Sequence, residues 1–72
     1  MNEKEIKEMM DFYDGKNIVL HIKLNTGRFY NGLFVEWDSP TVFVFNDRVL
    51  GLIHIFISQV EVVEEFMEGK EK

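Results

Sequence analysis

Two glycines in the stretch from Lys23 to Asp38 restrict the possible folds more than any other feature of this chain. Gly27 follows an Asn-Thr dipeptide between two apolar runs, and glycine readily adopts the positive φ that a tight hairpin turn requires. Gly32 comes five residues later within a strand pattern, where glycine usually marks a bulge or a tight bend. A strand bent in this way can serve both halves of a small curved sheet, and Asp38 ends it beside a Ser-Pro turn. The stretch therefore predicts a hairpin followed by a sharply bent strand.

Residues 2–14 have the pattern of an amphipathic helix. Asn2 and Glu5 have the spacing of a capping box, and Gly15 is a natural C-terminal stop. The apolar stripe at helical spacing is made of Ile6, Met9, Met10 and Tyr13. We expect this stripe to pack on the open end of a barrel, with the tyrosine hydroxyl reaching water. The alternative is an amphipathic segment that binds another partner.

The remaining patterns predict strands throughout residues 16–63. Apolar and polar side chains alternate over the first strand, which is typical of a strand buried on one face. The predicted strands are residues 16–24, 28–37, 41–45, 49–57 and 60–63, with turns at residues 46–47 and 58–59. The 72 residues form one domain, and residues 64–72 form an acidic tail that is partly disordered or a frayed helix. The predicted fold class is mainly β, a small bent five-stranded antiparallel SH3-like barrel with an N-terminal helix.

Residues 41–45 and 49–57 carry apolar side chains on both faces of their strands. A strand that is buried on both faces needs cover on both, whereas a small barrel has one interior. We expect a second copy to cover the outer face of residues 49–57, because pairing between copies would also hide the sheet edges. A head-to-tail contact of this kind closes into a ring. The alternative is that the helix and the tail alone cover this surface. The predicted interface residues are Val49, Ile53, Ile55, Ile57, Val60 and Val62.

Charge and composition limit the classes of function. The net charge is −5, but residues 16–63 hold four basic and four acidic side chains, so the acidity lies at the two ends. A neutral body permits a local RNA site and predicts weak non-specific binding. The chain has no cysteine, which excludes disulfides and thiolate metal sites. We expect a cytoplasmic protein without metal or cofactor, and not an enzyme, because no membrane span, signal peptide, metal-ligand cluster or nucleophile motif is present.

The chain resembles the Sm/LSm-like family, and within it the Hfq branch most closely. The first Sm motif has two glycines five residues apart. An apolar residue stands three positions before the first glycine. A second apolar residue stands two positions after the second glycine, and an aspartate six positions after it. Those places are occupied here by Leu24, Gly27, Gly32, Phe34 and Asp38. The Hfq branch also has a segment ending in Ile-Ser nineteen and twenty residues after the aspartate, where this chain has Ile57 and Ser58. The resemblance covers roughly residues 3–63.

The resemblance implies a ring of six or seven bent five-stranded barrels, the Sm fold, that binds RNA. Family members hold uridine-rich RNA near the motif aspartate and strand four, which correspond here to Ser39, Pro40 and residues 53–55. The other ring face, which binds adenine-rich RNA in the Hfq branch, corresponds to residues 27–31. An arginine beside aromatic rings and an amide suits stacking and base hydrogen bonding. Either Tyr30 or Phe29 is the stacking ring, because adjacent residues of a strand point to opposite faces. The predicted RNA contacts are Arg28, Tyr30, Asn31, Ser39, His54 and Gln59; Gly27, Gly32 and Asp38 are predicted to be structural.

Three functions are compatible with these patterns. The first is an Sm/Hfq-like homo-oligomeric ring that binds single-stranded RNA, uridine-rich or adenine-rich, with no membrane or small-molecule partner. The second is an Sm-fold oligomeric scaffold that has lost RNA binding and mediates protein interactions. Proline stands where the family has a base-stacking aromatic residue, and the Arg-Gly turn of spliceosomal members is absent, which favours the scaffold. The third is a single SH3-like barrel that binds peptides.

Overall fold

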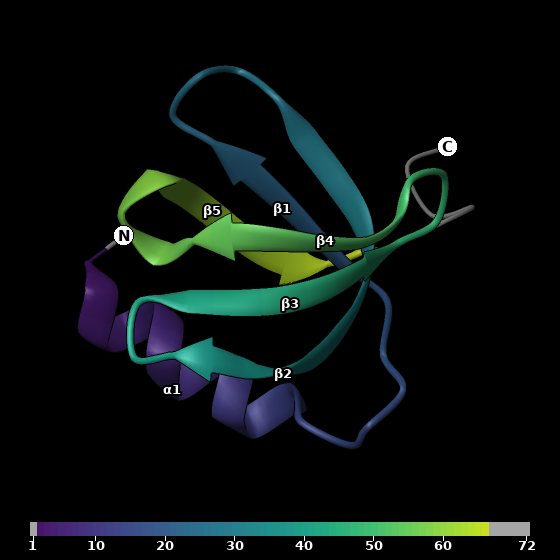
Figure 1. The fold of residues 1–72 in the computed structure, drawn as a ribbon, viewed down its shortest axis with the longest axis horizontal. Coiled ribbons are helices and arrows are strands. Elements are labelled where there is room, and N and C mark those ends of the chain that lie inside the picture. The colour runs from purple at the N-terminus through teal and green to yellow at the C-terminus, as the bar shows by residue number, and fades with distance from the viewer. Residues whose placement is uncertain (1, 67–72) are drawn as a thin grey trace.

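The computed structural model describes residues 2–66 as one α-helix and a bent antiparallel sheet of five strands (Figure 1). No helix in this range is long and apolar enough to cross a membrane. The elements are α1 (Glu3–Tyr13), β1 (Leu20–Leu24), β2 (Phe29–Ser39), β3 (Val42–Asp47), β4 (Gly51–Phe56), the 3-10 helix η1 (Ile57–Gln59) and β5 (Val60–Glu65).

The sheet has the strand order β4-β3-β2-β1-β5 and is not closed into a barrel. The predicted N-terminal helix and antiparallel sheet of five strands are confirmed. Within residues 2–66, no backbone pairing joins β4 to β5, so the bent sheet is open and not closed into a barrel. The reason is the 3-10 turn η1, which is tied to two hairpin turns. The Ile57 N–H donates to the Thr41 carbonyl at 3.0 Å, and the Asn25 N–H donates to the Gln59 carbonyl at 2.8 Å. The chain therefore crosses from one side of the bent sheet to the other, and β4 and β5 remain its two edges.

The bend lies in β2, which pairs with a different neighbour on each side of Gly32. Residues 29–32 pair with β1, and residues 32–39 pair with β3. This confirms that one strand serves both halves of the sheet. The register shifts lie after Gly32, at Val35 and Asp38, and not at the glycine itself. Glycine is required at position 32 because a Cβ there would overlap the carbonyl oxygen of Asn46.

The helix α1 begins as predicted and covers one end of the sheet (Figure 1). Asn2 and Glu5 form the reciprocal capping box, and Gly15 follows the helix with φ of 77°. Two side chains anchor the helix to the sheet. The Trp37 Nε1–H donates to Asp11 Oδ1 at 3.1 Å, and the Tyr13 hydroxyl donates to Glu65 Oε2 at 3.1 Å. Burial and the Glu65 carboxylate raise the pKa of Tyr13.

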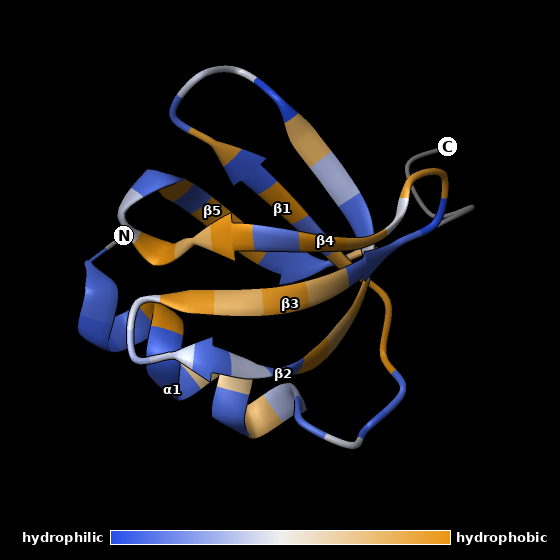
Figure 2. Cartoon of the chain, in the orientation of Figure 1, coloured by the Kyte–Doolittle hydropathy of each residue, from blue (hydrophilic) through white to orange (hydrophobic). Residues whose placement is uncertain are grey.

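The core lies between the two halves of the sheet and the helix. Ile6 and Met10 of α1 are fully buried, as are Phe43 and Phe45 of β3. The remaining buried apolar residues that pack with them are Leu20, Ile22, Leu24, Ile55, Ile57, Val60 and Val63. Figure 2 shows β3 as a hydrophobic strand through most of its length, in contrast to the largely polar outer side of α1.

Several element boundaries differ from the sequence-based predictions. β2 extends to Ser39 and so includes Asp38, and β4 begins at Gly51 and ends at Phe56. β1 begins at Leu20 and not at residue 16, because Asn17 has φ of 60° and cannot continue a strand. The predicted turn at residues 46–47 lies further on, since β3 extends to Asp47 and the turn covers residues 48–50. Glu64 and Glu65 belong to β5 and not to a tail, and the rest of that tail beyond Phe66 lies outside the described residues.

Candidate nucleic-acid interface

A surface pocket of about 530 Å³ lies between the start of β2 and the turn that joins β3 to β4. It combines two arginines, two aromatic rings and a side-chain amide with an apolar rim. Its lining residues are Arg28, Phe29, Tyr30, Asn31, Asp47, Arg48, Val49 and Leu50. Three predicted RNA contacts, Arg28, Tyr30 and Asn31, are thus brought together here. We call this the Arg28 pocket.

Asp47 builds the turn that forms one wall of the Arg28 pocket. The residue is 6% exposed, and its carboxylate accepts backbone hydrogen bonds from Asn31 at 3.1 Å, Val49 at 2.9 Å and Leu50 at 2.8 Å. Burial raises the pKa of Asp47, but these three N–H donors and the nearby Arg48 outweigh burial and hold the pKa below its usual value. The Arg48 N–H also donates to the Asn31 carbonyl at 2.8 Å. The turn is therefore fixed directly against β2.

The exposed aromatic ring of the pocket belongs to Phe29. Phe29 and Tyr30 are adjacent on β2, so their side chains point to opposite faces of the sheet. Phe29 is 59% exposed, whereas Tyr30 packs against the core and its hydroxyl accepts from Arg28 Nη1 at 3.3 Å. Either ring was considered for stacking, and Tyr30 was the one placed among the predicted contacts. The alternation of a strand reveals that one of the two is free, but it does not reveal which.

His21 lies beside the pocket and was not among the predicted contacts. It lies opposite Asn31 in the β1–β2 pairing, and its Nδ1 is 2.6 Å from Asn31 Oδ1. Its ring also lies 5.3 Å from the Phe29 ring, centroid to centroid. A hairpin centred near Thr26 places His21 opposite Asn31, since each is five residues from the centre. This equal spacing was the feature of the sequence from which the pairing could have been predicted.

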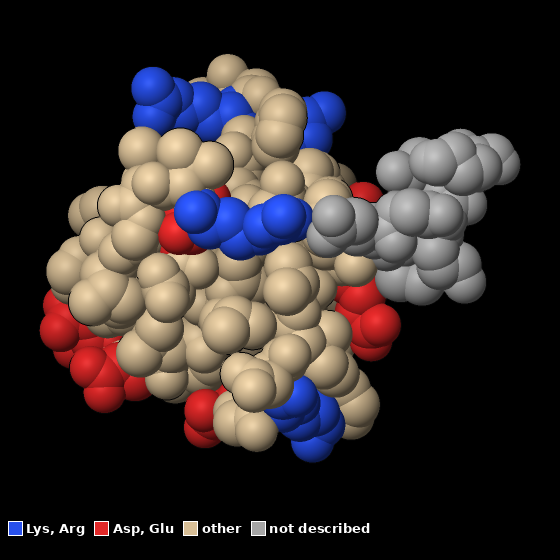
Figure 3. All heavy atoms as spheres, turned by 90° about the vertical axis from the view of Figure 1, so that its right-hand side faces the viewer, with Lys and Arg blue, Asp and Glu red and all other residues tan. Residues whose placement is uncertain are grey.

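Positive charge reaches the pocket from two directions. Arg28 precedes β2, and Arg48 begins the β3–β4 turn, where its guanidinium lies 5.2 Å from the centroid of the Phe66 ring. Figure 3, which views the side of the molecule that carries this turn, shows separate basic groups on a mostly uncharged surface. This face thus offers localised cationic contacts and no continuous basic patch.

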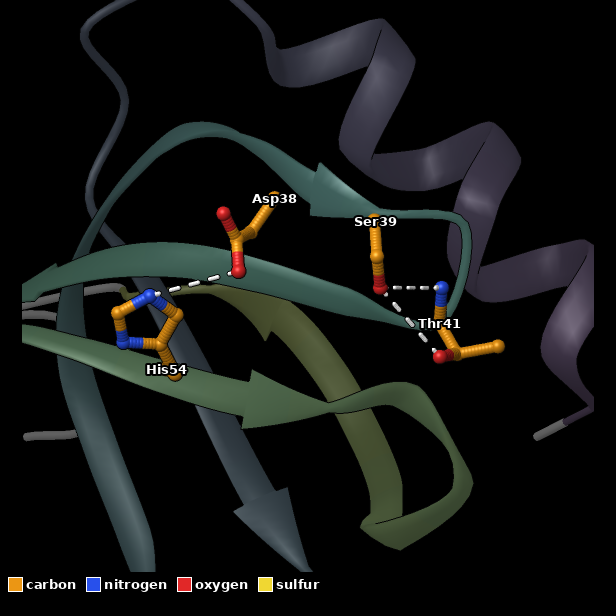
Figure 4. Close-up of polar contacts among 4 residues, drawn as sticks. All are labelled: Asp38, Ser39, Thr41 and His54. Atoms are coloured by element: carbon orange, nitrogen blue, oxygen red, sulfur yellow. Dashed lines mark hydrogen bonds and ion pairs between the residues drawn. The ribbon is translucent and has the colours of Figure 1, made fainter.

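Ser39 and His54, two other predicted RNA contacts, are not among the residues that line the Arg28 pocket. Figure 4 shows both side chains together with Asp38 and Thr41. His54 Nε2 on β4 is 3.7 Å from Asp38 Oδ2 on β2, and both side chains are exposed. The Ser39 Oγ accepts from the Thr41 N–H at 3.3 Å, so this hydroxyl holds the turn after β2. Asp38 was predicted to hold that turn, and its carboxylate instead lies beside the imidazole of His54. Gln59 lies in η1, where its backbone carbonyl accepts from Asn25.

The predicted interface residues divide into three groups. Ile55, Ile57 and Val60 are buried in the core of their own chain, so their side chains are not available to a second copy. Ile53 and Val62 are half-buried, and Val49 is 88% exposed in the β3–β4 turn. The exposed apolar side chains of β4 are instead Leu52 and Phe56, at 68% and 53%. The reason is register: the even-numbered residues of β4 face outward.

Among the described residues, no group of three or more histidine or acidic side chains could hold a metal ion. No protein-family model, no curated protein and no solved structure matches this chain.

Proposed function

We propose that this protein binds single-stranded RNA in the Arg28 pocket and assembles into an Sm/Hfq-like ring in the cytoplasm. The observation that carries the proposal is the composition of the pocket, whose lining includes two arginines, an exposed phenylalanine and an asparagine. Single-stranded RNA is recognised by stacking of unpaired bases on aromatic side chains and by cationic contacts to the phosphates. The Arg28 pocket supplies both kinds of contact within one cavity.

Each part of the pocket has a separate role in this proposal. Phe29 stacks on a base, and each such stack is worth about 1–3 kcal/mol. Arg28 and Arg48 bind phosphate oxygens, and Asn31 hydrogen-bonds a base edge. Asp47 keeps the β3–β4 turn in place through its three backbone hydrogen bonds and does not contact RNA.

The two free edges of the sheet support assembly. β4 and β5 lie at opposite ends of the strand order, and an unpaired edge is a template for pairing with another chain. Leu52 and Phe56 leave an apolar outer face beside the β4 edge, whereas β5 exposes Glu61, Glu64 and Glu65. Pairing of β4 in one copy with β5 of the next is head-to-tail and closes into a ring, which repeats the Arg28 pocket around the assembly.

A scaffold that has lost RNA binding is the second candidate. It is favoured by the contact between His54 and Asp38, because the carboxylate repels phosphate at the position where the family contacts uridine-rich RNA. This candidate shares the ring and differs only in the absence of RNA binding.

Removal of the exposed phenyl ring should separate the two candidates. We expect Phe29→Ala to weaken the binding of a fluorescein-labelled hexauridylate about tenfold, which is within the range for one lost stack. The measurement is fluorescence anisotropy at low ionic strength. Phe12→Ala is the matched control, because Phe12 on α1 is 60% exposed and lies outside the Arg28 pocket.

Phosphate contacts are tested with the same assay. A plot of the logarithm of the binding constant against the logarithm of the salt concentration has a negative slope. We expect Arg28→Ala to make this slope shallower by about one, because one phosphate contact is lost. Equal weakening by the Phe12 and Phe29 variants would contradict the assignment of the site. Absence of binding to uridine-rich and adenine-rich oligonucleotides in the unmodified protein would contradict RNA binding and favour the scaffold.

A further inference from the structure

The contact between His21 and Asn31 fixes which way the Asn31 amide points. His21 Nδ1 lies 2.6 Å from Asn31 Oδ1 in a partly buried position. An amide oxygen carries no hydrogen, so the imidazole nitrogen must be the donor. The oxygen of Asn31 therefore faces His21, and its NH2 group is left as the donor available to a ligand in the Arg28 pocket, which Asn31 lines.

An amide held in this way cannot recognise adenine in the usual manner. Asparagine reads adenine by presenting its oxygen and its nitrogen together to the N6 amino group and N7. Here the oxygen is directed at the imidazole. The remaining NH2 group, as a donor, instead matches an exocyclic carbonyl, which uracil has at O4 and guanine at O6, where cytosine and adenine carry amino groups.

From this geometry we infer that His21 is a positioning residue that makes the Arg28 pocket prefer keto bases over amino bases. The inference rests on the RNA site proposed above. The imidazole acts through Asn31 and also supports Phe29, since the His21 and Phe29 rings are tilted by 42° with centroids 5.3 Å apart. One residue thus holds both the stacking ring and the amide that reads the base edge.

Two pairs of oligonucleotides test this preference, because the two members of each pair have the same ring type and differ mainly in one exocyclic group. Hexauridylate and hexacytidylate are both pyrimidine chains, and hexainosinate and hexaadenylate are both purine chains. Within each pair, the group that the amide would meet changes from carbonyl to amino. We expect the unmodified protein to bind the keto member of each pair about tenfold more tightly, at the low end of the range for a base-edge contact.

Variants separate positioning from a purely structural effect. His21→Phe retains a ring beside Phe29 but has no Nδ1–H. The ratio of the affinities for the keto and amino members of each pair should therefore fall to about one, while the affinity averaged over the four oligonucleotides changes little. Asn31→Asp replaces the NH2 donor with an acceptor, so the preference should reverse towards amino bases. Asn46→Asp makes the same charge change on exposed Asn46 of β3, outside the pocket, and should keep the keto preference.

The outcomes distinguish this inference from the proposal beneath it. If none of the four oligonucleotides binds, the RNA site itself fails, and the inference fails with it. If all four bind with equal affinity, or if His21→Phe retains the keto preference, the inference is overturned while the RNA site stands. Nitrogen NMR of the imidazole supplies a readout without RNA. We expect the neutral ring to carry its proton on Nδ1, and a proton on Nε2 would overturn the inference.

Discussion

Gly32→Ala should unfold this protein or destabilise it by more than about 3 kcal/mol, the upper part of the range for overpacking a core. A Cβ at this position would lie 2.8 Å from the Asn46 carbonyl carbon and 2.9 Å from the Asp47 Cα. All of these neighbours are backbone atoms of β3, which pairs with β2 on this side. The strands cannot separate to make room without breaking the pairing that continues from Gly32 to Ser39.

The measurement is urea unfolding followed by circular dichroism, with Gly27→Ala as the matched control. Gly27 has φ of 95° but open space around the position of a Cβ, so its substitution adds backbone strain without a clash. We expect the control to lose about 1 kcal/mol. A Gly32→Ala protein as stable as the control would contradict the close approach of β3 to this glycine.

Asp47→Ala should destabilise the protein by about 3 kcal/mol or more, because it leaves three backbone N–H groups without their acceptor. The same substitution should release the β3–β4 turn from β2 and weaken RNA binding in the Arg28 pocket. Asp47→Asn should be milder, since one amide oxygen can replace part of the carboxylate. Urea unfolding of both variants, together with the hexauridylate assay, checks this order.

The lowered pKa of Asp47 also predicts how the stability difference depends on pH. Because the folded chain binds this proton more weakly than the unfolded chain, the stabilisation is complete above the usual pKa of 3.8. It is lost as the pH falls through the lower pKa of the folded state. The stability advantage of the unmodified protein over Asp47→Asn should therefore be constant near neutral pH and shrink below about pH 4. An advantage that does not change down to pH 2 would contradict the assigned role of the carboxylate.

The sequence predicted correctly those elements that depend on residues close to one another in the chain. The capping box of Asn2 and Glu5 lies within one helical turn, and the alternation of Leu20, Ile22 and Leu24 needs no knowledge of distant residues. The spacing of Gly27 and Gly32 likewise predicted a hairpin followed by a strand shared between two halves of the sheet. These features depend on backbone geometry and on the period of the side chains.

Features that depend on distant neighbours could not be predicted in the same way. Gly32 is needed because Asn46 lies against it, fourteen residues later in the chain. Asp47 resembles a turn residue in sequence, but it ends β3 and binds Asn31 across the sheet. The outward face of β4 depends on its register with β3, and for this reason buried Ile55 was taken for an interface residue in place of Leu52.

The candidate site was predicted in part. Arg28, Tyr30 and Asn31 were selected, and the structure adds the opposite wall formed by Arg48, Val49 and Leu50. His21 was not selected, and Phe29 was only an alternative to Tyr30, because exposure and cross-strand pairing, rather than residue type, distinguish them from their neighbours. Ser39, His54 and Gln59 came from the family resemblance, and within the described residues none of them lines the Arg28 pocket.

Native mass spectrometry of the purified protein, with and without short uridine-rich and adenine-rich oligonucleotides, tests the central proposal most directly. We predict the mass of a closed ring, a hexamer or heptamer, that gains oligonucleotide at low ionic strength and takes up the uridine-rich one more readily. A ring that binds neither oligonucleotide would contradict RNA binding and leave the scaffold. A monomer at micromolar concentration would contradict assembly through the β4 and β5 edges.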